Sequence, residues 1–182
     1  EFITTKPVSV STSKHLVREL VDYLDSSNAE ANDRTSTHIH VNVEPLTKEL
    51  RKRFLMMLVM HDDTFYQFSN LRRKRNNFCT PVLYNPVFYY LLNRVLENTS
   101  FNYDSKYSSI NVCPIDTLGS IELRHFPTLM NLNHFDLVVD KLEALYMHLL
   151  DTEDEDIKVA LTIEGYEPER DWVLAVLESI GQ

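Results

Sequence analysis

Hydrophobic and polar residues alternate from residue 37 to residue 43, which is the period of a β-strand with one buried face. The apolar residues of this segment are expected to face the protein core. The opposite, polar face then carries His38, His40 and Asn42. The alternation therefore predicts a strand that presents two imidazoles and one amide to the same side.

Apolar residues recur at helical spacing in several other segments. Leucines repeat at intervals of four from Leu16 to Leu24, after Ser11 and Ser13, either of which can cap a helix. The clearest repeat covers residues 135–149 and predicts an amphipathic helix that packs on a sheet. The predicted helices run through residues 16–24, from Thr47 to about Met60, and through 87–97, 135–149 and 171–180.

Two further strands are predicted at residues 107–114 and 120–126, with a hairpin-type connection at 116–119. In the second of these strands Glu122 and Arg124 share a face. A short strand is also expected at residues 2–5, and an irregular, basic and aromatic stretch at 66–81. These elements predict an α+β fold, with a curved antiparallel sheet, helices packed on its outer face and a cleft on its polar face.

The composition is that of an ordinary globular protein, with 43% hydrophobic residues among 182. This length suffices for one sizeable core, so a single domain over residues 1–182 is expected. No apolar run approaches the ~18 to 20 residues needed to cross a bilayer, and the N-terminal residues lack the charged-then-apolar pattern of a signal peptide. We therefore predict a cytoplasmic protein with no membrane partner.

Charge and glycine content exclude two common modes of binding. A net charge of -9 opposes a nucleic acid partner, because phosphate contacts require a positive face. The three glycines, Gly119, Gly165 and Gly181, are too far apart to form a P-loop or a GxGxxG turn. Any nucleotide must therefore be held by side chains on strands. Cys79 and Cys113 are too few for a disulfide framework and are expected to be free thiols.

The polar faces of two predicted strands define the candidate chemistry. A carboxylate and a neutral imidazole can bind a divalent cation, and a guanidinium can hold phosphate oxygens through two hydrogen bonds. If the strands are neighbours, His38, His40, Glu122 and Arg124 converge. The alternative is that Glu122 and Arg124 form ordinary cross-strand pairs on a solvated face. The basic run at residues 72–75 is likewise either a solvated loop or part of a phosphate site.

Three segments, in their order along the chain, resemble the amidoligase family, a branch of the glutamine synthetase and glutamate-cysteine ligase superfamily of carboxylate-amine ligases. They are STHIHVNV at residues 36–43, KYSSINV at 106–112 and GSIELR at 119–124, the last followed by FPTL at 126–129. The resemblance extends from residue 1 to the helix after residue 129. It implies a fold similar to the glutamine synthetase catalytic domain.

The same resemblance implies roles for individual residues. It makes His38 and Glu122 metal ligands and puts His40 beside the nucleotide. It makes Arg124 a partner of phosphate or of the substrate carboxylate, so that Glu122 and Arg124 are the catalytic candidates. Its looser matches add nucleotide-binding candidates, which are Lys106 and Asn111 in a KYxxxN-like segment and Arg75 or Arg72 before the Phe78-Cys79 pair.

The function that the resemblance implies is ATP-dependent joining of a carboxylate to an amine through an acyl phosphate. ATP and Mg²⁺ are the expected cofactors, and small-molecule or peptide carboxylates and amines are the expected substrates. The family opens with a GxExE-like strand that is missing from this sequence. We therefore expect a segment with these glutamates to precede residue 1.

Two alternatives stay open. A ligase fold without activity can serve as a structural or binding module, with His38 and Glu122 buried under a partner subunit or a second copy of the chain. A metal-dependent hydrolase is the other alternative, because an HxH strand also opens many barrel amidohydrolases. Such barrels usually need about 250 residues, which argues against this second reading.

Overall fold

The computed structural model describes residues 4, 6–30, 35–69, 71–82, 107–128 and 131–151. Its elements in chain order are α1 (Val10–Ser26), β1 (Ser36–Asn42), α2 (Lys48–Met60), α3 (Asp62–Tyr66), α4 (Leu71–Lys74), β2 (Ile110–Asn111), α6 (Ile115–Leu118), β3 (Ser120–Pro127) and α7 (Leu132–Asp151). The predicted helices at 87–97 and 171–180 lie outside the described residues, as does the predicted strand at 2–5 except for Thr4.

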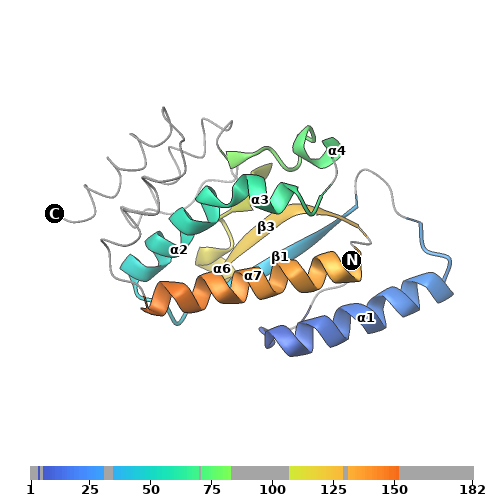
Figure 1. The fold of residues 1–182 in the computed structure, drawn as a ribbon, viewed down its shortest axis with the longest axis horizontal. Helices are drawn as coiled ribbons and strands as arrows, with labels where there is room; N and C mark the ends of the chain where they lie inside the picture. Colours follow the sequence, from blue (N-terminus) through green and yellow to red (C-terminus); the bar gives the residue numbers. More distant parts are fainter. Residues whose placement is uncertain are drawn as a thin grey trace.

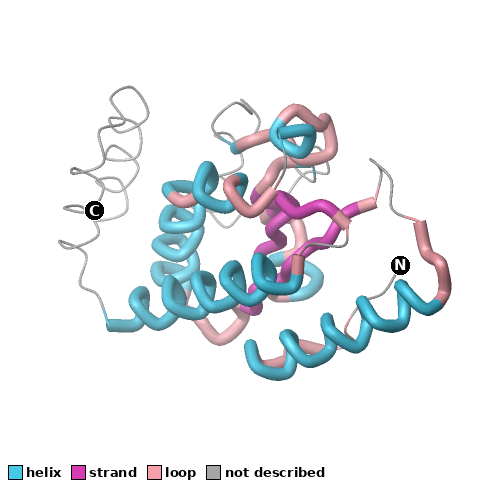
Figure 2. Tube along the Cα trace, turned by 45° about the vertical axis from the view of Figure 1, so that its right-hand side comes forward, coloured by secondary structure: helices cyan, strands magenta, loops and turns pink. Residues whose placement is uncertain are grey.

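A small antiparallel sheet lies at the centre of the described structure, with its strands in the order β1-β3-β2. Helices α2 and α7 pack against each other and contribute with the strands to one hydrophobic core (Figure 1). Figure 2 shows the strands enclosed between these helices and the loops around α4. The α+β class with an antiparallel sheet is therefore confirmed, while likeness to glutamine synthetase remains a prediction.

Helix α2 is an interior helix because its second half is apolar on all sides. Thr47 caps its N-terminus as predicted, since the Thr47 hydroxyl accepts from the backbone N–H of Leu50 at 3.3 Å. A helix with apolar residues on every face has no face suited to solvent, so α2 must be covered by both the sheet and α7. Its buried apolar residues are Phe54, Leu55, Met56, Met57, Leu58 and Val59.

Helix α1 lies at the periphery, alongside α7 (Figure 1). None of its residues is fully buried, and two ion pairs hold it to α7. Lys14 Nζ lies 2.5 Å from Asp140 Oδ1, and Arg18 pairs with Asp136. The predicted caps Ser11 and Ser13 are wrong, because Ser9 has the extended backbone of a capping residue and its hydroxyl accepts from the N–H of Thr12.

Strands β2 and β3 pair in antiparallel orientation, as a hairpin-type connection predicts. Strand β2 is, however, much shorter than the predicted strand at 107–114. Residues 115–118 form the short helix α6 instead of a simple turn. Gly119 then reverses the chain with φ +62°, and a Cβ at this position would lie 2.9 Å from Glu44 Cβ. The prediction of an irregular stretch at 66–81 is also wrong in part, because residues 71–74 form α4.

The pairing of β1 with β3 contains a β-bulge. The register shifts between Thr37 and Ile39. On β1 this interval holds one residue, His38, while on β3 the matching interval holds two residues, Arg124 and His125. An extra residue of this kind bends a strand and redirects its side chains, and such bulges are frequent next to functional sites. The irregularity thus falls on two residues of the candidate chemistry, His38 and Arg124.

Among the described residues, no helix has the length and apolar character needed to cross a membrane.

Candidate functional site

The sheet register brings the histidines of β1 to the glutamate of β3. His40 stands directly opposite Glu122 in the antiparallel pairing, and His38 lies at the bulge. His38 Nδ1 lies 2.6 Å from Glu122 Oε1, and His40 Nε2 lies 3.8 Å from the same oxygen. The predicted convergence of the two polar faces is therefore confirmed.

Glu122 is the centre of this cluster, with 5% of its surface exposed. Asn111 stands opposite it on β2 and donates from Nδ2 to Glu122 Oε2 at 2.5 Å. Arg124 Nη1 lies 3.4 Å from both carboxylate oxygens. Because an ionised carboxylate only accepts hydrogen bonds, His38 Nδ1 must carry a proton and donate it to Glu122. Glu122 is thus held by donors from all three described strands.

These contacts set the protonation state of the cluster. Burial by itself raises the pKa of Glu122, but the hydrogen bond from His38, the charge of Arg124 and the hydrogen bond from Asn111 outweigh burial and lower that pKa to about 2. Burial lowers the pKa of His40, against the attraction of Glu122, and the neighbouring His38 and Arg124 lower it further. At neutral pH the cluster therefore combines an ionised carboxylate with a neutral His40 imidazole.

Arg124 is held by the backbone as well as by Glu122. Its Nε donates to the carbonyl of Phe78 at 3.3 Å, and its backbone N–H donates to the carbonyl of Ser109 at 2.8 Å. Its own carbonyl accepts from Arg73 Nη2 at 2.6 Å. Only 15% of the Arg124 side chain is exposed. The guanidinium is therefore fixed in one place, as anion recognition by arginine requires.

Sequence reasoning missed several residues of this site. Ser36 Oγ lies 2.8 Å from His38 Nε2, and Ser120 Oγ lies 3.0 Å from His40 Nδ1. Ser36 could have been found, because it precedes His38 by two residues and so shares its face in a strand. Arg73 sits within the basic run at 72–75, but nothing in that run distinguishes the buried arginine from its neighbours.

The remaining predicted residues fall outside the cluster or outside the described structure. Arg75 follows α4 and is exposed, and the contacts of the described residues do not join it to Glu122. Asn42 uses its side-chain oxygen to accept from the backbone N–H of Glu44 at 3.0 Å. Lys106 and the side chain of Arg72 are not among the described parts of the chain. Five candidates therefore lie together, which are His38, His40, Asn111, Glu122 and Arg124.

The cluster does not by itself fit a magnesium ion. Within the described ranges, no group of three or more His, Cys, Asp or Glu side chains could hold a metal. Mg²⁺ prefers octahedral oxygen ligands, and Glu122 is the one carboxylate in this cluster. Both of its oxygens already accept hydrogen bonds from the protein. A metal here would need further oxygen ligands besides His38 and Glu122.

Comparison with known proteins identifies the first half of the chain. A family model described as "Putative amidoligase enzyme" matches residues 3–95, which are 93 of the 182 residues. The match includes β1 with His38 and His40 and ends before β3 with Glu122 and Arg124. No curated protein and no solved structure matches the chain. Because this match covers just over half of the chain, it shows that the chain belongs to the amidoligase family.

Proposed function

We propose that this chain carries part of the active site of an ATP-dependent ligase that joins a carboxylate to an amine. The proposal rests on one arrangement: Arg124 lies at 3.4 Å beside a buried, ionised Glu122 that both histidines of β1 face. The family is that of amidoligases, so amide formation is the reaction to test at this cluster. ATP and Mg²⁺ are the cofactors that the proposal requires.

The proposed reaction has two steps. An oxygen of the substrate carboxylate attacks the γ-phosphorus of ATP, so that ADP leaves and an acyl phosphate forms. The amine nitrogen of the second substrate then attacks the carbonyl carbon, inorganic phosphate leaves and the nitrogen gives up a proton. Negative charge on phosphate oxygens accompanies both steps, and a fixed cation stabilises it.

Four residues of the cluster have a part in this proposal. Arg124 binds phosphate oxygens or the substrate carboxylate, and its preset position removes the cost of ordering a long side chain. Glu122 holds Arg124 and the Nδ1 proton of His38, so it orients both groups. His40 is neutral at pH 7 and meets the nucleotide as a hydrogen-bonding group. Removing one such contact with the transition state typically costs ~3 kcal/mol.

Nucleotide binding tests the proposal before any substrate is known. The thermal midpoint of the chain is measured with and without the Mg²⁺ complex of a non-hydrolysable ATP analogue. Selective binding at ~100 times Kd adds ~2.7 kcal/mol to stability and raises the midpoint. The shift is expected to disappear in Arg124→Lys and His38→Ala and to persist in Glu143→Gln, an exposed change on α7.

Three outcomes separate the readings. A shift that Arg124→Lys abolishes supports the ligase site. A shift that survives both substitutions places the nucleotide elsewhere. No shift in the unmodified chain favours an inactive ligase fold that acts as a structural or binding module.

One observation favours a second candidate function, which is ester hydrolysis by a serine. Ser36 Oγ, the His38 imidazole and Glu122 form a hydrogen-bonded chain of nucleophile, base and carboxylate. In this reading Ser36 Oγ attacks an ester carbonyl, and His38 Nε2 takes the hydroxyl proton and passes it to the leaving alkoxide. Water then releases the acyl group from Ser36. A fluorophosphonate probe that labels the chain but not Ser36→Ala supports this function, and an unlabelled chain rules it out.

A further inference from the structure

A second polar cluster is buried behind the candidate site, and it consists of Asp62, Ser109 and His125. The geometry points to Asp62 as a positioning residue that sets the place of Arg124 through the β-bulge of β3. This inference builds on the proposed function, because it concerns the cation of the same site. Within the described part of the chain, the hydrogen bonds of Asp62 go to Ser109, His125 and Val82 rather than to a residue of the candidate site, so Asp62 acts through these partners.

Asp62 begins α3 and accepts three hydrogen bonds from other described residues in the protein interior. Its Oδ1 lies 2.6 Å from Ser109 Oγ and 2.7 Å from His125 Nε2. Its Oδ2 accepts from the backbone N–H of Val82 at 3.3 Å. Asp62 is 1% exposed, and Ser109, His125 and Val82 are fully buried. A carboxylate removed from water in this way is tolerated only while its donors stay in place.

Each donor to Asp62 is close in sequence to a group that holds Arg124. Ser109 supplies its hydroxyl to Asp62 and its carbonyl to the N–H of Arg124 at 2.8 Å. His125 follows Arg124 directly and is the second residue of the bulge. A displacement of Ser109 or His125 therefore also displaces the backbone of Arg124, because Ser109 is hydrogen-bonded to Arg124 and His125 is the next residue in the chain.

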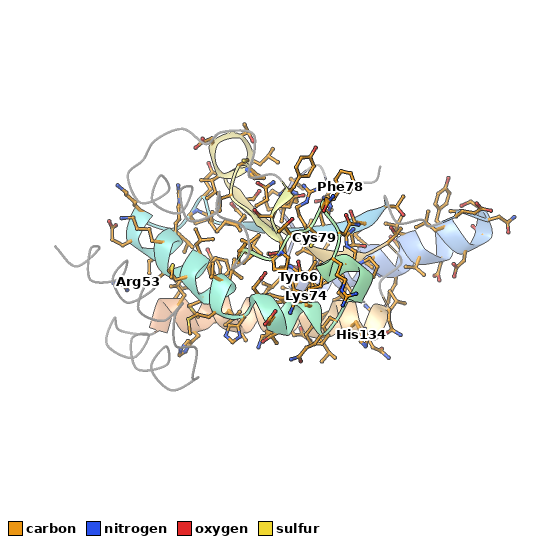
Figure 3. The ribbon with its side chains drawn as sticks, turned by 90° about the horizontal axis from the view of Figure 1, so that it is seen from above. Arg53, Tyr66, Lys74, Phe78, Cys79 and His134 are labelled. Carbon is orange, nitrogen blue, oxygen red and sulfur yellow. The ribbon has the colours of Figure 1, made fainter. Side chains whose placement is uncertain are left out.

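The third donor fixes the loop that receives the Arg124 side chain. Val82 follows the segment in which Thr80 pairs with Ser108 and Phe78 accepts from Arg124 Nε. The Tyr66 hydroxyl donates to the carbonyl of Cys79 in the same segment at 2.7 Å. Figure 3 shows Tyr66 and Cys79 close together, with Phe78 directly before Cys79 in the chain. Asp62 thus ties both the backbone and the side-chain partner of Arg124 to α3, which packs on β3 (Figure 1).

A purely structural role would not require hydrogen bonds at this position in the core. Apolar residues of similar volume fill a core at least as favourably as a buried charged cluster. Directional hydrogen bonds, in contrast, fix the distance between α3, the bulge and the loop at 78–82. A bulge has an unpaired residue that needs such support. The polar cluster therefore suits a site whose guanidinium must stay in one position.

The test is Asp62→Asn, which keeps the size of the side chain but replaces one acceptor oxygen with an NH₂ group, so that at least one of the three hydrogen bonds is lost or reversed. Two quantities are measured on the full chain below its unfolding transition. The first is the Kd for the Mg²⁺ complex of a non-hydrolysable ATP analogue, expected to rise about tenfold. The second is the NMR resonance of the Arg124 Nε–H, assigned by its loss in Arg124→Lys and expected to shift.

Leu142→Ala is the matched control, because it leaves a cavity in the core at α7 and lowers stability without removing a hydrogen bond of Asp62. It is expected to leave both the Kd and the Arg124 resonance as they are. A purely structural role for Asp62 predicts that Asp62→Asn behaves like this control, and that result overturns the inference.

Two further arms keep the result decisive. If Asp62→Asn does not fold, Ser109→Ala removes a single donor and is expected to shift the Arg124 resonance and to raise Kd about threefold. An unchanged resonance in Ser109→Ala then overturns the inference. If the unmodified chain binds no nucleotide, the proposed function fails, but the Arg124 resonance in Asp62→Asn still decides whether Asp62 positions Arg124.

Discussion

Neutralising Glu122 should destabilise the protein at neutral pH but not in acid. In Glu122→Gln the side chain keeps its shape and loses its charge. Asn111, His38 and Arg124 all donate to this carboxylate, so the new NH₂ group must face at least one donor. The substitution therefore removes the favourable electrostatics and also opposes the existing hydrogen bonds.

The magnitude follows from the pKa of the Glu122 carboxyl. It lies at about 2 in the folded chain, against an ordinary value of 4.5. One pKa unit corresponds to ~1.4 kcal/mol, so ionised Glu122 contributes about 3 kcal/mol to the free energy of unfolding at pH 7. Because the folded-state pKa is the lower one, this contribution is present above pH 4.5 and is lost as pH falls toward 2.

The assay is urea unfolding at a series of pH values from 7 downward, at constant ionic strength and with a chelator present. The free energies of unfolding of the parent chain and Glu122→Gln are expected to differ by about 3 kcal/mol at pH 7 and to converge in acid. Glu143→Gln, exposed on α7, controls for the loss of a carboxylate as such. Equal stabilities at pH 7, or a difference that does not change with pH, would refute the reasoning.

Three further predictions test the described structure. Gly119→Ala should lower the free energy of unfolding by more than ~1 kcal/mol, because φ is +62° and the new Cβ meets Glu44; an unchanged urea midpoint would contradict the tight turn. Thr47→Ala should cost ~1 kcal/mol in the same assay through loss of the α2 cap, whereas Ser11→Ala, which removes a serine that is not the cap of α1, should cost far less. Burial raises the pKa of the Cys79 thiol, so iodoacetamide at pH 8 should modify Cys113 well before Cys79, as read by mass spectrometry, and equal rates would contradict the buried position of Cys79.

Local sequence patterns determined the elements whose periodicity is long or strict. The alternation at 37–43 predicted β1, and the apolar repeat at 135–149 predicted α7, because burial of one face imposes a period of 2 or 3.6 along the chain. The alternation at 37–43 placed His38 and His40 on one face of that strand. The period of two in the predicted strand at 120–126 placed Glu122 and Arg124 on one face of the second strand. The meeting of those two faces was a hypothesis that the antiparallel register of β1 and β3 confirmed.

Tertiary structure alone decided which residues surround that meeting point. The bulge at Arg124 and His125 depends on how two distant strands pair, and no local pattern encodes an extra residue in one of them. Arg73 became a partner of Arg124 through a contact across 51 residues of chain. Asp62 became a buried acceptor through contacts across 20, 47 and 63 residues. Periodicity reports which face of an element is buried, whereas the partner of a buried polar group is set by packing between elements.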